Sequence, residues 1–408
     1  MRWKSQHGRA LKHPAHSAPL ERGFSLWRAL VLLLFGLLAL RGMPAGAQAV
    51  PPLGPLVLGL NTPDQTHILL YDLELDFARE VVLGEGAHTL WGFSPDGCRL
   101  LATLDDQLVT ARLDGRDVRR LLPSGAGGAY EPSFSPDGRQ IAFTLVQLEG
   151  NETRRFIAVV DAEGGSPRTL SFSGREATPR WSPDGARIAY VSYEQRVAGA
   201  DLFSTAVPTP TPAAGVTLPP VALLNEADLW TVEVASGQRT RLTNFPTGSV
   251  SMPRWSPDGT LLAFVYSPAP NQDLLWIIAG EAGAIPTQLS FEYTTALDLG
   301  WLPDGTHLIA SLMGMQGIAE NALWQIPLAG RAEQGALRYL AFYDLPHADY
   351  PRFRDDGRWF ALRTRYQIAL IDMLSATLRR LSAPWALGST PPVWSPAAFN
   401  GEAACADR

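Results

Sequence analysis

The sequence predicts an all-β protein, a single β-propeller of about seven four-stranded blades. One short motif recurs along the chain at similar spacing, several strand-like stretches follow each copy, and no helical pattern separates the copies. Four strands per repeat without intervening helices favour a propeller over a solenoid. Six or eight blades are alternatives that the spacing leaves open.

The motif is an aromatic residue, then Ser-Pro-Asp-Gly or a close variant, then an apolar stretch typical of a strand. Proline presets φ at the second turn position and glycine accepts the left-handed exit, so the motif predicts a type I turn within a hairpin. The copies occupy residues 92–103, 133–144, 180–192, 254–266, 300–311 and 352–363, and a truncated copy (VWSP) occupies 393–396.

The acidic and glycine residues of these motifs are interpreted as turn formers. Each carboxylate belongs to its own hairpin, so they cannot converge on one metal ion. The aspartates are 41, 47, 74, 46 and 52 residues apart, and steps near 45 suit one blade each. The turn residues are Asp96, Gly97, Asp137, Gly138, Asp184, Gly185, Asp258, Gly259, Asp304, Gly305, Asp356 and Gly357.

The two ends of the repeat region are predicted to share one blade. Residues 55–60, 67–73 and 78–83 resemble three strands without a first one, and residues 392–394 resemble a first strand without the rest. Pairing them would remove two open sheet edges. The tryptophans that recur at the aromatic position of the motif are interpreted as packing residues; they are Trp181, Trp255, Trp301 and Trp394.

The longest step contains a Pro-rich stretch, residues 204–223. Proline supplies no ladder donor, so this stretch is predicted to be a loop inserted between two strands of one blade. It is either an arm extending from the rim or an insertion without function.

Residues 1–49 are predicted to be a signal peptide. They contain seven basic residues, an apolar run of 12 residues at 29–40, and the small-x-small sequence Ala47-Gln48-Ala49. We therefore expect three parts: the signal peptide, the propeller at 50–399 and a C-terminal tail at 400–408. The expected location is extracytoplasmic, whether periplasmic, cell-surface or secreted. The alternative is an uncleaved membrane anchor at 29–40.

Charge and composition exclude several classes of function. Without residues 1–49 the chain has 27 basic and 39 acidic residues, a net charge of −12, which disfavours nucleic acid as a partner. Lys4 and Lys12 are the only lysines in the sequence, so the remaining chain has no P-loop, Schiff-base or general-base lysine. The two cysteines, Cys98 and Cys405, either form a disulfide that closes the ring or are two unrelated thiols.

No catalytic motif is present. The chain lacks HExxH and Gly-x-Ser-x-Gly, and His67, His88, His307 and His347 form no metal-ligand pair at helical spacing. About a dozen residues follow the closing strand, so we expect no separate hydrolase domain there. No cofactor and no metal are expected.

The predicted binding surface lies just before the first strand of each blade, because a propeller gathers one such segment per blade around its axis. Mixed carboxylates, arginines and tyrosines there suit a protein, peptide or glycan partner, and a monomer is expected. Ordinary solvated charge and inter-blade salt bridges are the alternative. The candidates are Tyr130, Glu131, Glu176, Arg180, Arg254, Asp298, His347, Asp349, Tyr350 and Arg352.

Trp-Ser-Pro-Asp-Gly followed by Arg-x-Ile-Ala-[Phe/Tyr] resembles the WD40-like repeat of the TolB-type propellers. The resemblance covers nearly all of residues 55–396, with departures at Leu302 and Asp355. It implies an exported or periplasmic bacterial protein. TolB itself is similar to an α/β domain followed by a propeller, whereas strands begin here soon after the predicted cleavage point, so TolB itself is not expected.

Three functions are compatible with these observations. The first is a non-catalytic extracytoplasmic scaffold that binds a protein or another ligand, within a cell-envelope assembly. The second is a hydrolase or lyase in the central channel that uses Asp298, His347 or Asp349 as acid or base. The third is a sensor held by a membrane anchor. Fold alone does not decide among them.

Overall fold

In a computed structural model the chain divides into two units, Met1–Pro51 and Pro52–Arg408. The structure describes residues 51–197, 223–290, 294–314, 322–328, 337–338, 349–364, 367–375, 377–381 and 391–405. The predicted signal peptide, the Pro-rich insert up to residue 222, and His347 lie outside these residues. Within the described ranges, no helix has the length and apolar character needed to cross a bilayer.

The described residues form an all-β fold, as predicted, with one short 3-10 helix. Five sheets have four strands each, in the orders β28-β1-β2-β3, β4-β5-β6-β7, β8-β9-β10-β11, β20-β21-β22-β23 and β24-β25-β26-β27. Their strands are β1 (Val57–Asn61), β2 (Ile68–Asp72), β3 (Phe77–Val81), β4 (His88–Phe93), β5 (Arg99–Leu104), β6 (Gln107–Arg112), β7 (Arg119–Arg120), β8 (Gly128–Phe134), β9 (Gln140–Glu149), β10 (Glu152–Asp161), β11 (Arg168–Thr169), β20 (Thr295–Trp301), β21 (His307–Met313), β22 (Ala322–Pro327), β23 (Leu337–Arg338), β24 (Asp349–Phe353), β25 (Trp359–Arg363), β26 (Ile368–Asp372), β27 (Thr377–Leu381) and β28 (Val393–Trp394).

A sixth sheet has eight strands, so the structure shows five separate four-stranded blades where the sequence predicted seven. One parallel pair, Ala227 opposite Ser249, links β14 to β16 and joins the two halves of this sheet. Its strands are β12 (Glu176–Trp181), β13 (Arg187–Val197), β14 (Leu223–Glu233), β15 (Arg239–Arg241), β16 (Ser249–Trp255), β17 (Leu261–Ala269), β18 (Gln272–Ala279) and β19 (Thr287–Gln288).

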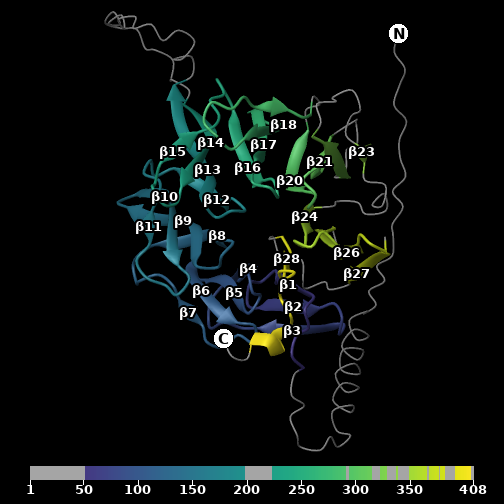
Figure 1. Ribbon diagram of the computed structural model, residues 1–408. Coiled ribbons are helices and arrows are strands. Elements are labelled where there is room, and N and C mark those ends of the chain that lie inside the picture. Colours follow the sequence, from purple (N-terminus) through teal and green to yellow (C-terminus); the bar gives the residue numbers. More distant parts are fainter. Residues whose placement is uncertain are drawn as a thin grey trace, which may run out of the picture. The chain divides into compact units, whose positions relative to one another are not determined.

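The strands that begin the successive repeats form a closed ring. β4 contacts β8, and contacts continue through β12, β16, β20, β24 and β28 back to β4. β28 is hydrogen-bonded to β1 in antiparallel register, with Trp394 opposite Leu58, so the predicted pairing of the two ends is confirmed. In Figure 1 the yellow strand β28 lies next to the purple strand β1.

Apolar side chains from neighbouring sheets form the core. Leu70 of one sheet and Leu100 of the next are fully buried in the same cluster, and comparable clusters fill the other junctions between neighbouring sheets. The recurring tryptophans lie at these junctions, where each indole N–H donates to a main-chain carbonyl of the neighbouring repeat. The pairs are Trp181 with Ser133 (3.1 Å), Trp255 with Arg180, Trp301 with Arg254 and Trp394 with Arg352 (each 3.0 Å).

The Ser-Pro-Asp-Gly turns are held by bonds within each turn. The hydroxyl of Ser256 donates to Asp258 at 2.5 Å, and this bond lowers the pKa of that carboxyl, as equivalent bonds do for Asp137 and Asp184. Arg354 takes the place of serine in the sixth turn and donates to Asp356 at 2.8 Å. The six turn glycines all have φ between 70° and 76°.

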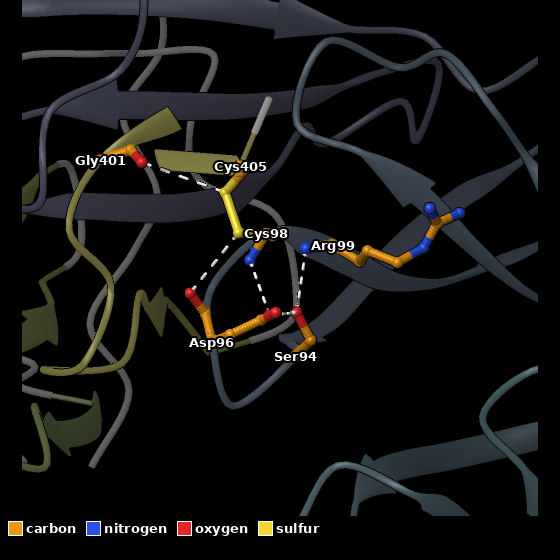
Figure 2. The surroundings of a disulfide bond; sticks show 6 residues. All are labelled: Ser94, Asp96, Cys98, Arg99, Gly401 and Cys405. Atoms are coloured by element: carbon orange, nitrogen blue, oxygen red, sulfur yellow. Dashed lines mark hydrogen bonds between the residues drawn. A yellow bond between two sulfur atoms is a disulfide. The ribbon is translucent and has the colours of Figure 1, made fainter. Parts of the chain in front are cut away.

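The C-terminal tail completes the ring at the junction of its two ends. Phe399 is almost fully buried and lies against Gly97, where an added Cβ would come within 2.5 Å of the phenyl ring. The 3-10 helix Glu402–Cys405 follows, and Glu402 accepts from the main-chain N–H of Leu53 at 2.9 Å. Cys405 is bonded to Cys98 with a Cα–Cα distance of 5.5 Å (Figure 2).

Candidate functional site in the central channel

Four of the ring strands contain the same bulge. In β8, β12, β16 and β24 the register shifts ahead of the aromatic residue, and a non-glycine residue there has positive φ. The residues are Glu131 (50°), Thr178 (58°), Met252 (54°) and Tyr350 (52°), each followed by a proline. Left-handed non-glycine residues are uncommon and strained, and they gather at sites where a strand must redirect a side chain.

The bulges are followed by a recurring arginine. Arg180, Arg254 and Arg352 each donate through Nη1 to the carbonyl of the proline directly before them, at 2.8, 3.1 and 2.9 Å. This bond holds one end of the planar guanidinium in place. The other N–H donors of the group can then reach a neighbouring repeat. Three repeats therefore present the same cation in the same way.

Asp298 of β20 connects two of these arginines. Its side chain is 4 % exposed and receives bonds from Arg254 at 3.1 Å and from Arg352. The main-chain N–H of Leu299 donates to the same carboxylate at 2.8 Å. Arg180 pairs in turn with Glu131 at 3.4 Å. One group therefore links the charges of two repeats and the other links the charges of three, rather than charges within single blades.

Burial affects the ionisation of the central arginine. It lowers the pKa of Arg254 to about 10, and the charge of Arg180 acts in the same direction, while Asp298 opposes both. Arg254 remains protonated at neutral pH. The arrangement thus holds several N–H donors in a partly desolvated place, which suits recognition of a carboxylate or another anionic acceptor.

These side chains line a cavity of about 750 Å³. Six of the ten predicted binding residues lie in its wall: Glu131, Arg180, Arg254, Asp298, Tyr350 and Arg352. Apolar and aromatic residues complete the lining, among them Trp91, Met252 and Phe353. A concave site with a few convergent polar groups in an apolar wall is the usual form of a ligand pocket.

Of the other four predicted residues, three do not line this cavity and one lies outside the described residues. Tyr130 is 40 % exposed and donates to Asp106 at 2.9 Å. Glu176 is buried and accepts from the main-chain N–H groups of Ser173, Gly174 and Arg175, so it holds a loop. Asp349 is described only by its main chain, which pairs with Arg363, and His347 lies outside the described residues.

The sequence reasoning missed several lining residues. Met252 precedes a proline at the same position as Glu131 and Tyr350, and this x-Pro spacing before the aromatic residue was the signal that could have revealed it. Trp91 follows no such pattern, because its repeat lacks the proline. Among the described residues, no three His, Cys, Asp or Glu side chains gather in a way that could hold a metal ion.

Comparisons with known proteins bear on the family. No protein-family profile matches the chain. TolB of Legionella pneumophila (strain Corby) is 28 % identical over 141 residues, covering 34 % of this chain and 27 % of TolB. The resemblance to TolB is confirmed. The low identity is consistent with a TolB-like chain rather than with TolB itself.

Two further proteins are similar to this chain. The uncharacterized peptidase YuxL of Bacillus subtilis is 25 % identical over 237 residues, covering 56 % of this chain and 28 % of YuxL. A solved structure of a puromycin hydrolase mutant complexed with PGG has a TM-score of 0.58 and 14 % identity, covering 83 % of this chain and 54 % of that chain; this likeness shows the fold alone. The matches span little more than a quarter of the length of YuxL and of TolB.

Proposed function

We propose that this TolB-like chain is a non-catalytic, extracytoplasmic binding propeller that holds a protein or peptide partner in the mouth of its central channel. The observation that supports this most directly is the row of three guanidinium groups, each aimed by the same bulge into one cavity. Their linking carboxylates, Glu131 and Asp298, are engaged in ion pairs, which suits recognition better than proton transfer.

The proposal includes the parts of the chain that frame this site. Counting the eight-stranded sheet as two blades joined by one bridge gives seven blades around the channel. Residues 1–49 act as a signal peptide and are removed, and the mature chain starts at Val50. The tail at 400–408 belongs to the ring junction through its disulfide. The chain acts as a monomer in an envelope assembly, without a cofactor.

Site-specific photocrosslinking in the native host tests the site. p-Benzoylphenylalanine replaces Tyr350, which lines the cavity, and in a matched control it replaces Leu374, which is 82 % exposed and does not line the cavity. We expect irradiation of the Tyr350 variant to give one discrete adduct that the Leu374 variant does not give. The chain is recovered from the extracytoplasmic fraction, and its intact mass is expected to begin at Val50.

Two results would reject the proposal. Absence of an adduct at Tyr350, when the variant is exported and folded, would remove the channel as the partner site. Identical adducts at both positions would show contact unrelated to the channel. A chain retained in the cytoplasm would refute export independently of either result.

A further inference from the structure

Two exposed arginines of neighbouring repeats form no ion pair among the described residues. Arg155 lies in β10, and Arg175 lies in the loop before β12. A parallel bridge pairs the two residues, and the N–H of Arg155 donates to the carbonyl of Gly174 at 2.9 Å. Residues paired across a bridge project to the same face of the sheet, so two positive charges stand side by side.

Other arginines of these two repeats do form ion pairs. The neighbouring Arg154 pairs with Glu149 at 3.0 Å, and Arg180 pairs with Glu131. The chain has 40 acidic and 34 basic residues, so carboxylates are abundant. Adjacent like charges repel each other, yet neither the Arg155 nor the Arg175 side chain forms an ion pair within the described part of the fold. The positive charge is therefore available to a partner.

Two exposed tyrosines lie near the two arginines. Tyr130 is 40 % exposed and Tyr193 is 37 % exposed, and the main-chain N–H of Tyr193 donates to the carbonyl of Arg175 at 3.0 Å. Arg155 is within electrostatic reach of both tyrosines: it opposes the rise in the pKa of Tyr130, caused first by the bond to Asp106, and the rise in the pKa of Tyr193, caused first by burial. Exposed tyrosine and arginine together are typical of the residues that dominate protein–protein binding energy.

The surface lies beside a strand that contributes to the channel wall. Tyr193 lies in β13, which pairs with β12, and Arg180 of β12 lines the cavity. Arg180 also pairs with Glu131, which lines the same cavity. Two neighbouring strands therefore contribute to this surface and to the channel wall.

We propose that the surface formed by Tyr130, Arg155, Arg175 and Tyr193, here called the arginine–tyrosine surface, binds an acidic peptide segment of the partner. This inference rests on the proposed function and adds the chemistry of the partner to it. Carboxylates of the segment pair with the two guanidinium groups, and its remaining side chains pack on the aromatic rings. The rest of the segment enters the channel.

Panning a phage-displayed library of random dodecapeptides on the mature chain tests this inference. We expect the recovered peptides to be enriched in Asp and Glu. Their affinity should fall about tenfold for the double variant R155Q/R175Q, because two charge pairs are lost. The matched control is R116Q/R139Q, which changes two arginines with side chains 86 % and 85 % exposed, outside both the cavity and this surface, and should bind unchanged.

The outcomes separate the two proposals. Peptides without an acidic excess, or peptides that bind R155Q/R175Q as tightly as the parent chain, would overturn the inference; if they are also weakened by R180Q in the channel, the proposed function stands. Peptides that bind R180Q and R155Q/R175Q unchanged, or failure to recover any peptide, would overturn both. Near-UV circular dichroism of each variant shows that the fold is retained.

Discussion

The first strand of each repeat has a bulge near one end and the Ser-Pro-Asp-Gly turn at the other, and the charged residues at these two ends find their partners at different distances along the chain. At the turn end, Asp184 and Asp258 bond to groups of their own hairpin, such as the hydroxyls of Ser182 and Ser256. At the bulge end, a few residues away, Arg254 and Arg352 cross to Asp298 of another repeat. The charged residues therefore bond within their own hairpin at one end of the strand and to another repeat at the other end.

The difference shows why the ends contribute differently to the molecule. A carboxylate satisfied within its own turn specifies a hairpin and can be repeated without regard to the neighbouring blades. A carboxylate such as Asp298, which pairs with arginines of the two neighbouring repeats, needs those repeats to be packed together. The turn end therefore has the same bonds in repeat after repeat, whereas the ion pairs at the bulge end differ between repeats.

The largest expected effect is loss of the covalent link at the ring junction. Replacing both cysteines (C98S/C405S) should lower the free energy of unfolding by about 2–5 kcal/mol, because the disulfide constrains a loop with a sequence separation of 307 residues. Urea unfolding of the variant, and of the parent chain with and without reductant, measures this.

Reductant should leave the variant unchanged while it destabilises the parent chain to the same level. Labelling of two thiols in the native parent chain without reductant would contradict the disulfide.

A smaller loss is expected from breaking the shared carboxylate. Asp298→Asn keeps the shape of the side chain and leaves Arg254 and Arg352 without a counter-charge, which should cost about 2 kcal/mol, a value reduced from that of a fully buried pair because both arginines are partly exposed. The matched change at the turn end, Asp258→Asn, should cost less. Urea midpoints at pH 7 compare the two, and an equal loss would show that the shared carboxylate has no special weight.

The sequence predicted the turn end far better than the bulge end, for a physical reason. Proline, aspartate and glycine act on their own backbone, so the hairpins and the pairing of β28 with β1 followed from local patterns and the need to cover open edges. The single bridge between Ala227 and Ser249 was not predictable, because it depends on how closely strands of two neighbouring repeats approach each other in space. That bridge is why the structure shows five separate four-stranded blades rather than seven.

Convergence in space limited the prediction of the site. Arg180, Arg254 and Arg352 were identified by their position before the aromatic residue, but which carboxylate each would meet could not be derived from spacing. Glu176 was expected in the channel, yet the three N–H groups of its own loop hold it. Arg155 and Arg175 were overlooked, because only the bridge between the two segments makes them neighbours.

The smallest expected effect is a pH dependence that arises at the turn end. Bonds within the turns lower the pKa of Asp137, Asp184 and Asp258 below the ordinary value of 3.8. The unfolded chain then binds more protons than the folded chain in acid, so stability rises with pH in this range. The stabilisation is complete above about pH 5 and is lost progressively as the pH falls below about 4 towards the folded pKa values.

The triple variant D137N/D184N/D258N should therefore lose less stability between pH 5 and pH 3 than the parent chain, as measured by urea midpoints across that range. Parallel curves for the two chains would mean that the turn carboxylates do not contribute to acid sensitivity.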